Sequence, residues 1–380
     1  MKRRLFLVFH GRFPGEKAAS LFAAKSAEAF ADVGLEVTVL VPKRKGVDSQ
    51  TAYDYFGVRN VFSIVEIPAT ELSPVFRKIS FWMSYRSFSK GIVAYIKAHA
   101  VSDDIVYSNE TLPLLAASRV AGNTFYEMHD FPESKLALFG RFLKKMKWVL
   151  VHNKWKMEKV ERAFGISAER MLYEPNAVDI GAFDISVSKE EARKKLGLPP
   201  DKKIAVYTGH LYGWKGVDAL AQAAGMLADD FLAVFVGGTD ADVAAFKSKY
   251  GDSPRILIAG HKKYAEIPVW QKAADVLALP NSGKEAISLY YTSPMKLFEY
   301  MASRRPIVAS DIPSIREIVD GSSASLVPPD DAKALADAIR TLASDSQGGE
   351  ALAQSAFARV SSHTWEKRAR RILSFIEKNG

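Results

Sequence analysis

Short apolar runs alternate with helical patterns along the chain, and this alternation limits the fold more than any other feature of the sequence. Most of the runs are largely apolar, as is typical of parallel strands that helices cover on both faces. We expect strands at 4–9, 35–41, 61–67, 104–107, 124–128, 148–151, 170–174, 203–208, 231–236, 256–259, 276–279, 307–309 and 325–327. We expect helices at 16–33, 74–100, 112–120, 133–147, 154–164, 215–227, 331–343 and 364–378, and a polar, turn-rich stretch at 43–57. The pattern therefore predicts an α/β fold with a parallel sheet in each half.

The chain is long enough for two globular cores. It has 380 residues, 48% of them hydrophobic, and a single core rarely grows beyond about 250–300 residues. It contains no cysteine, which excludes disulfides, thiolate catalysis and cysteine-bound zinc and is compatible with a reducing cytoplasm. The start, MKRRLFLVFHGRFPG, has an apolar run of about five residues, which is shorter than a signal-peptide core of about 7–15 residues. We therefore expect a soluble chain that is not exported by this route.

The stretch that begins at Ser293 contains a cation where a helix favours an anion. Ser293 followed by Pro294 is typical of an N-cap and a first-turn proline, and apolar residues then recur with helical spacing. Arg-Arg-Pro at 304–306 ends this helix before the expected strand at 307–309. Lys296 thus lies in the first turn, where the helix dipole favours a negative charge by about 0.3–1 kcal/mol.

Two interpretations of Lys296 remain open. In the first, the free amides of Met295 and Lys296 hold a diphosphate, and Glu299, one turn further on, accepts hydrogen bonds from sugar or ribose hydroxyls. In the second, Lys296 and Glu299 form an exposed i, i+3 ion pair that contributes about 0.2–0.5 kcal/mol. Only the first predicts a ligand site at the start of this helix.

The same stretch resembles the donor-nucleotide signature of the retaining glycosyltransferases of family 4. KLFEYMA followed by a PIVAS strand and an REI helix is typical of that family, and SPMKLFEYMA is similar to its SPLKLFEYMA-like branch. The family usually carries two glutamates separated by seven residues. Glu299 matches the second, Tyr291 stands in the place of the first, and Glu285 lies too far upstream to replace it.

The loop at 209–218, GHLYGWKGVD, resembles the family's G-x-L-x-x-x-K-G-x-D motif. It follows an expected strand and opens a helix, so that backbone amides and the Lys215 ammonium can meet a phosphate. His210 stands where the family often has a basic residue and offers a weaker charge, so we expect donor affinity to fall as pH rises through the histidine range. The alternative is that Lys215 is a solvated lysine at a helix start.

His129 and Asp130 follow an expected strand, and ligands collect at such strand ends in open α/β sheets. The family carries a His-Asp pair there, which the resemblance places near the acceptor and the anomeric carbon. A structural histidine is the alternative. The turn FPGEKAAS matches a loop that the family places at the reaction centre, with Arg12, Gly15 and Glu16, although Gly15 also fits a plain turn.

The resemblance covers nearly the whole chain and implies the GT-B fold, in which two Rossmann-like domains face each other across a cleft. It implies an acceptor-binding domain at 1–178, completed by a C-terminal helix at 364–380 that crosses back, and a donor-binding domain at 179–363. The implied reaction moves a sugar, with retention of configuration, from a nucleotide diphosphate sugar to a glycan or lipid-diphosphate acceptor in surface polysaccharide or glycoconjugate synthesis. UDP is favoured over GDP. The alternatives are a non-catalytic nucleotide-sugar-binding protein, suggested by Tyr291, and a GT-B-fold nucleotide-sugar epimerase.

The resemblance also assigns roles to individual residues. Catalytic residues would be His129, Lys215 and Glu299. Donor-binding residues would be Gly15, Gly209, His210, Lys215, Ser293, Pro294, Met295, Lys296 and Glu299, and acceptor-binding residues Arg12, Glu16, His129 and Asp130. No metal or cofactor is expected. Asp240-Ala241-Asp242 looks like the D-x-D metal motif of the other large glycosyltransferase fold, but it stands at a helix start, where the dipole favours acids.

The first half of the chain carries most of the net charge of +9. Residues 1–180 hold 26 Lys and Arg against 19 Asp and Glu, whereas residues 181–380 hold 26 against 24. Nucleic acid, an anionic membrane and a phosphorylated acceptor would each suit this field, but no nucleic-acid-binding motif accompanies it. The segment 135–162 combines nine basic and two acidic residues with Phe139, Phe142, Trp148 and Trp155. We expect this segment and 76–97 to contact anionic lipid at the inner face of the cytoplasmic membrane, with a solvated helix face as the alternative.

Overall fold

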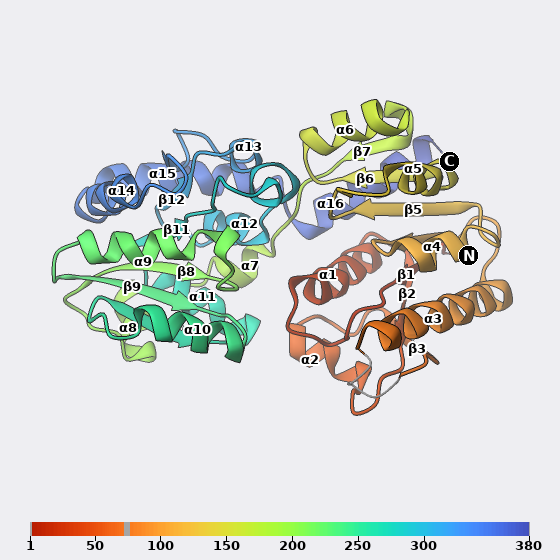
Figure 1. Cartoon of the computed structure of the whole chain (residues 1–380), viewed down its shortest axis with the longest axis horizontal. Coiled ribbons are helices and arrows are strands. Elements are labelled where there is room, and N and C mark those ends of the chain that lie inside the picture. Colours follow the sequence, from red (N-terminus) through yellow and green to blue (C-terminus); the bar gives the residue numbers. More distant parts are fainter. Residues whose placement is uncertain (1, 72–76, 380) are drawn as a thin grey trace. The chain divides into compact units, whose positions relative to one another are not determined.

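The computed structural model describes residues 2–71 and 77–379, which form two compact units (Figure 1). Unit 1 consists of Met1–Pro175 and Trp365–Gly380, and unit 2 of Asn176–Thr364. Each unit contains one parallel sheet with helices on both faces, as the sequence predicts. Residues 74–76, where the expected long helix begins, lie outside the described residues.

The sheet of unit 1 has the strand order β3-β2-β1-β4-β5-β6-β7, and every neighbouring pair is parallel. Its strands are β1 (Arg4–Val8), β2 (Glu36–Pro42), β3 (Ser63–Ile67), β4 (Ile105–Ser108), β5 (Asn123–Met128), β6 (Trp148–Val151) and β7 (Met171–Tyr173). The order reverses direction between β1 and β4, which makes the sheet doubly wound. The strands β4, β5 and β6 are buried along their whole length, because both of their faces pack against helices.

Two groups of helices cover this sheet (Figure 1). The helices are α1 (Ala18–Asp32), α2 (Ala52–Phe56), α3 (Arg77–His99), α4 (Thr111–Ala117), α5 (Leu136–Lys145), α6 (Lys154–Phe164) and α16 (Trp365–Lys378). Helices α3 to α6 form one core with the strands. On the other face, α1 and α16 pack together, and Phe375 of α16 meets the ring of Phe125 in β5. The C-terminal helix therefore returns to unit 1, as predicted.

The stretch 43–57 is more ordered than the expected turn. Asp48 accepts a hydrogen bond from the amide of Gln50 at 3.0 Å and so caps a 3₁₀ turn, Ser49–Thr51, which runs into α2. The prediction of a turn-rich stretch missed these two short elements, because elements this short are set by a cap and carry no hydrophobic period.

The sheet of unit 2 has the strand order β10-β9-β8-β11-β12-β13, again all parallel. Its strands are β8 (Lys203–Thr208), β9 (Phe231–Val236), β10 (Ile256–Gly260), β11 (Val276–Leu279), β12 (Ile307–Ser310) and β13 (Ser325–Val327). On one face lie α9 (Val217–Met226), α10 (Asp240–Tyr250) and α14 (Ala332–Ser344). On the other lie α7 (Ile180–Phe183), α8 (Lys189–Leu196), α11 (Ile267–Lys272), α12 (Met295–Ala302), α13 (Pro313–Arg316) and α15 (Ser346–Val360).

Helix α15 is the longest element that the sequence does not predict. Asp345 caps it by accepting the amide of Gly348 at 2.9 Å. Gly348 and Gly349 fill its first turn, where two glycines suggest a loop. A Cβ on Gly349 would lie 3.0 Å from the ring of Pro306, so the glycine lets α15 approach closely beside α12. This unpredicted helix therefore supports the element that carries Lys296.

Within each unit, the predicted site residues follow the carboxyl ends of parallel strands. In unit 1 they follow β1 and β5, and in unit 2 the loop at 209–216 follows β8. This edge is where open α/β sheets bind ligands, so the topology alone brings these residues to the right place.

Candidate functional site

Two glycines hold the loop after β8 against its neighbours. Gly216 has φ +69°, and a Cβ there would lie 1.7 Å from the carbonyl oxygen of Pro280 in the loop after β11. Gly209 has φ +130°, and a Cβ there would lie 3.2 Å from Nζ of Lys296. Only glycine fits such positive-φ positions without strain. The motif thus brings the β8 loop directly onto the first turn of α12.

Lys296 is a shielded cation without a counterion. Its Nζ lies 3.8 Å from the centroid of the Tyr207 ring and has no hydrogen-bond partner among the described residues. Burial, reinforced by the charge of Lys215, holds the pKa of Lys296 well below its ordinary value. The alternative of an exposed pair with Glu299 is wrong, because the ammonium points to Tyr207 and Glu299 is only 7% exposed. This arrangement favours an anionic ligand at Lys296.

Ser293 does not cap α12 as expected. Pro294 occupies the cap position, and the hydroxyl of Ser293 instead accepts the amide of Asn176 at 3.3 Å. The asparagine side chain also donates to the carbonyl of Ser293, which ties this turn to the start of unit 2. The prediction fails because Asn176 competes for the serine. Helix α12 consequently begins without a side-chain cap, and the first amides, of Met295 and Lys296, suit an anion.

Lys215 and His210 lie close to Lys296. Nζ of Lys215 lies 3.6 Å from the centroid of the Trp214 ring, and burial lowers the pKa of Lys215 to about 7. Lys215 is thus half-buried against Trp214 and is not a fully solvated lysine. The ring of His210 stacks on Tyr212, and burial lowers its pKa as well, so this imidazole is uncharged near neutral pH. Near neutral pH the charge of Lys215 varies, whereas the expected change at His210 falls at lower pH.

Glu299 lies one turn along α12 from Lys296. Its Oε1 accepts a hydrogen bond from the hydroxyl of Tyr264 at 3.1 Å, and burial raises its pKa to about 7. Near neutral pH this group can accept a hydrogen bond as a carboxylate or donate one as an acid. Both forms suit a sugar or ribose hydroxyl.

The acids of the D-x-D sequence belong to a helix cap. Asp242 accepts the amide of Thr239 at 3.0 Å, and the Thr239 hydroxyl accepts the amide of Asp242 at 3.2 Å. This capping box begins α10 and confirms the prediction of a helix start. Tyr291, in the place of the family's first glutamate, ends a π-helix (Ile287–Tyr291).

His129 lies half-buried at the end of β5 in unit 1, and Asp130 beside it is exposed. The amide of Asn109 donates to Nδ1 of His129 at 3.4 Å, and Nε2 lies 3.4 Å from Oε1 of Glu127. The ring also meets the edge of Phe22. Both ring nitrogens thus face fixed groups, which sets the orientation of the imidazole.

Glu127 is the buried centre of this site. Its Oε1 lies 2.5 Å from Nε2 of His152 and 2.6 Å from a guanidinium nitrogen of Arg368, and the Tyr107 hydroxyl donates to its Oε2. Burial acts to raise the pKa of Glu127, but Arg368 and the two histidines hold it well below its usual range. Burial lowers the pKa of His152 to about 3. The carboxylate is therefore ionised beside a neutral imidazole and a guanidinium.

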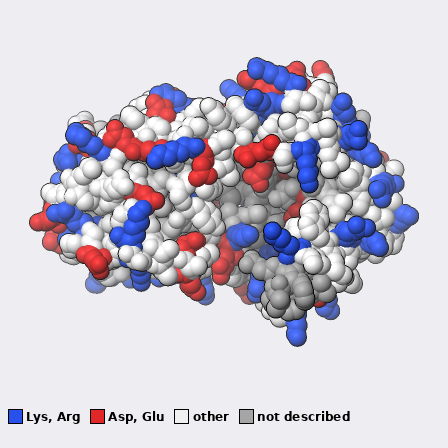
Figure 2. All heavy atoms as spheres, viewed as in Figure 1, with Lys and Arg blue, Asp and Glu red and all other residues white. Residues whose placement is uncertain are grey.

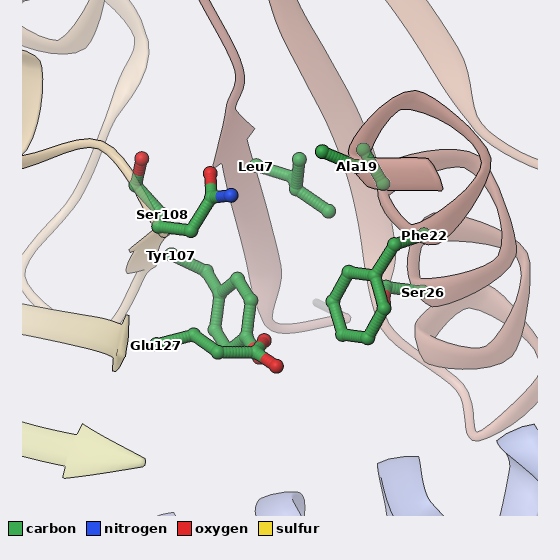
Figure 3. Close-up of a pocket in the computed structure, with 9 residues that line it drawn as sticks. Leu7, Ala19, Phe22, Ser26, Tyr107, Ser108 and Glu127 are labelled. Carbon is green, nitrogen blue, oxygen red and sulfur yellow. The ribbon is translucent and has the colours of Figure 1, made fainter. Parts of the chain in front are cut away.

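A small cavity adjoins this carboxylate, between β1, α1 and the ends of β4 and β5. Figure 3 shows the Glu127 carboxylate beside the rings of Tyr107 and Phe22. The cavity is lined by Leu7, Ala19, Phe22, Ala23, Ser26, Tyr107, Ser108, Asn109 and Glu127. The cavity therefore leaves open space next to the Glu127 carboxylate, which faces His129.

Glu127, His129 and His152 could hold a metal ion, since their ligand atoms lie within 4.8 Å of one another. Sequence spacing does not reveal this group, because the three residues come from two strands. Arg368 lies 2.6 Å from the same carboxylate oxygen, so a divalent cation would have to displace or repel a guanidinium. The arrangement suits a charge-balanced hydrogen-bond network better than a metal centre.

The loop after β1 carries the other predicted residues of unit 1. Arg12 and Glu16 are exposed there. A Cβ on Gly15 would lie 2.6 Å from the carbonyl oxygen of Arg12, so the turn itself requires this glycine. The alternative of a plain turn glycine accounts for Gly15 without a ligand.

The basic segment 135–162 is less exposed than expected. Phe142 and Trp148 are buried in the core of unit 1. Lys156 is also buried and donates to the carbonyl oxygens of Met128 at 3.1 Å and His129 at 2.5 Å. These residues cannot belong to a membrane-facing surface. Lys156 instead fixes the end of β5.

Residues 202–345, most of unit 2, match the family described as "Glycosyl transferases group 1". The putative teichuronic acid biosynthesis glycosyltransferase TuaC of Bacillus subtilis is 23% identical over 349 residues, which cover 86% of this chain and 84% of TuaC. The lipopolysaccharide core biosynthesis mannosyltransferase LpsB of Rhizobium meliloti is 30% identical over 53% of this chain and 59% of its own length. The crystal structure of Anabaena Alr3699/HepE in complex with UDP-glucose has a TM-score of 0.77 at 19% identity and covers 99% of both chains. The chain therefore has the GT-B fold and is related to glycosyltransferases, including enzymes of polysaccharide and glycoconjugate synthesis.

Proposed function

We propose that this protein transfers a sugar from a nucleotide diphosphate sugar to a glycan or lipid-linked acceptor, with retention of configuration. Of the two donor classes considered, we favour a UDP-sugar over a GDP-sugar. One observation carries the proposal: Lys296 and Lys215 lie close together at the strand ends of unit 2, partly shielded, with pKa values lowered by burial. Two such cations repel each other unless a polyanion binds between them. A diphosphate is the ligand that this charge arrangement fits.

Each unit has its own part in the proposed reaction. In unit 2, the start of α12 with Lys296 and Lys215 neutralises the leaving diphosphate, and Glu299 holds hydroxyls of the donor. In unit 1, His129 orients the acceptor, which attacks from the face that the diphosphate leaves, so no protein nucleophile is needed. HepE, which shares the fold, was crystallised in complex with UDP-glucose, and this supports a UDP-sugar as the proposed donor.

A screen of UDP, GDP and their sugars by thermal shift, followed by a transfer assay with the stabilising sugar, tests the proposal. Sugar transfer or donor hydrolysis supports a transferase. Binding without turnover would instead support the nucleotide-sugar-binding alternative that Tyr291 suggests. Conversion of the donor without any acceptor would support an epimerase.

Activity should survive exhaustive chelation, because two lysines and a helix N-terminus can neutralise the leaving group without a divalent ion. The measurement is sugar transfer before and after treatment with EDTA. Loss that magnesium or manganese restores would contradict the prediction and implicate Asp240 and Asp242. Restoration by zinc alone would point to Glu127, His129 and His152.

Unit 1 presents a surface suited to anionic lipid, and we propose that it contacts the membrane there. Lys and Arg outnumber acids on the face of unit 1 in Figure 2. None of the helices within 2–71 and 77–379 is long and apolar enough to span a bilayer. Exposed large apolar side chains cluster on the first turns of α3 and on α5, namely Ile79, Phe81, Trp82, Met83, Leu136 and Leu138. Exposed cations accompany them, namely Lys78, Arg86, Arg141, Lys144 and Lys145.

The protein should co-sediment with anionic vesicles more than with neutral ones, since each exposed cation near the surface adds about 1 kcal/mol. Trp82→Ser should lower this binding, because Trp82 is 58% exposed and would enter the interface. Met226→Ser, a control at a 53% exposed residue of unit 2, should not change it. Equal binding to both vesicles, or to neither, would reject membrane contact.

A further inference from the structure

The C-terminal helix places a guanidinium against the carboxylate that faces His129. Arg368 of α16 and Glu127 of β5 are 241 positions apart in sequence, and both side chains are almost fully buried. The arginine also donates to the carbonyl of Pro175 at 3.1 Å and lies 5.1 Å from the Phe22 ring. These contacts fix the guanidinium in one position.

A single carboxylate oxygen of Glu127 lies close to three basic groups. Oε1 of Glu127 faces Arg368 at 2.6 Å, His152 at 2.5 Å and His129 at 3.4 Å. The two imidazole rings lie 4.7 Å apart between their centroids. A change in the charge of any one member therefore acts directly on the others.

Charge balance in this buried cluster depends on Arg368. The guanidinium and the carboxylate cancel, so the buried His152 imidazole needs no proton. Without Arg368, the buried carboxylate would require a new positive partner, and an imidazole, with an ordinary pKa about two units above that of a carboxyl group, takes the proton first. The other ionisable groups around the cluster are Lys156 of α6, which acts on His152, Glu110 after β4, which acts with His129, Tyr107 of β4 and the exposed Asp130.

We propose that Arg368 is a positioning residue for the proposed transfer: by balancing Glu127, it keeps His152 uncharged and holds His129 in one orientation at the end of β5. The effect on turnover rests on the proposed function. The charge arrangement itself rests only on the contacts within unit 1. In the intact chain, docking of the C-terminal helix is thus required to set the orientation of His129.

Arg371 provides a matched control. It lies about one turn further along α16 and pairs with both oxygens of Glu174, at 2.6 and 2.7 Å. Arg371→Gln removes a charged anchor of the same helix at a different carboxylate. Any effect of Arg368→Gln that comes merely from loosening α16 should appear in both variants.

Nitrogen-15 NMR of the His152 ring between pH 3 and 8 tests the charge arrangement without an activity assay. We expect its imidazolium signal in Arg368→Gln at a pH at least about one unit higher than in wild type. The His152 ring of Arg371→Gln should titrate like wild type. A His152 ring in Arg368→Gln that titrates as in wild type would overturn the proposal.

The transfer assay tests the consequence. Arg368→Gln should lower kcat about tenfold, because His129 loses its fixed orientation, and move the acid limb of its pH profile upward, with KM for the nucleotide sugar unchanged. Arg371→Gln should lower the melting temperature and leave the limb in place. A limb that moves equally in both variants would reject the positioning role. If wild type transfers no sugar, the proposed function fails, while the NMR result still decides the charge arrangement.

Arg368→Lys keeps the proposal testable if Arg368→Gln does not fold. Lysine retains the charge without the planar fork, so the His152 imidazole should stay neutral and the acid limb should remain at its wild-type position. An imidazolium at His152 in Arg368→Lys at a pH where wild type has none would contradict the role of the charge.

Discussion

Lys296→Met should weaken UDP binding by about 1.5–3 kcal/mol and raise the melting temperature of the ligand-free protein. The loss of affinity is the usual contribution of a hydrogen bond to a charged group. The gain in stability follows because the wild-type ammonium is shielded, unpaired and destabilised by Lys215, whereas a methionine of similar length keeps the packing on Tyr207. Calorimetry with UDP and a thermal melt measure the two effects.

Lys249→Met is the matched control for this prediction. Its ammonium pairs with Asp218 at 2.6 Å on the surface of unit 2, so its replacement should leave UDP affinity unchanged and alter the melting temperature little. A structural lysine at 296 would show lost stability and normal affinity instead. Unchanged UDP affinity in Lys296→Met would remove the main support for a diphosphate site.

The strands could be predicted almost completely, because most of them are largely apolar runs in sheets that helices cover on both faces. The helices were harder where local composition opposes them. Helix α15 has Gly348 and Gly349 in its first turn, and its stability comes from packing beside α12. Tertiary contacts of this kind outweigh the low helix propensity of the local residues, and a short segment of sequence does not show them.

The cations of the donor site could be predicted because they break a local rule. Lys296 stands in the first turn of a helix and Lys215 in a glycine loop, and both places favour an anion. The sequence could not show that Asn176 would take Ser293 away from the helix cap. The Ser293 hydroxyl can bond to any polar group that the fold brings near it. The sequence does not show which groups these are.

The network around His129 was missed because its members are distant in sequence. Two weak signals were present: Glu127 is a charged residue inside an apolar strand, and Arg368 lies on the buried side of α16 with Trp365, Ala369, Ile372 and Ile376. Each is a buried charge that needs a partner. Neither residue identifies the other as its partner, because the two lie 241 positions apart in the sequence and only the fold brings them together.

His129→Ala should lower turnover by about 10²–10⁴, the usual range for loss of a positioned polar catalytic group, with UDP affinity close to wild type. The side chain is 24% exposed at the strand ends of unit 1, where an acceptor can reach it. UDP affinity should hold because the proposed donor residues lie in unit 2. Turnover, UDP affinity and melting temperature on one variant separate the two interpretations of this histidine.

A structural histidine would give the reverse pattern, with a lower melting temperature and normal turnover per folded molecule. His99→Ala, at an exposed ring stacked on Tyr95 of α3, controls for the loss of an imidazole elsewhere in unit 1 and should behave like wild type. The contacts of His129 with Asn109 and Phe22 contribute some stability, so a small drop in melting temperature is expected even for a catalytic residue. The size of the turnover loss relative to the drop in melting temperature separates the two roles. Turnover within about threefold of wild type would end the catalytic assignment, because loss of a proton-transfer or orienting group lowers turnover far more.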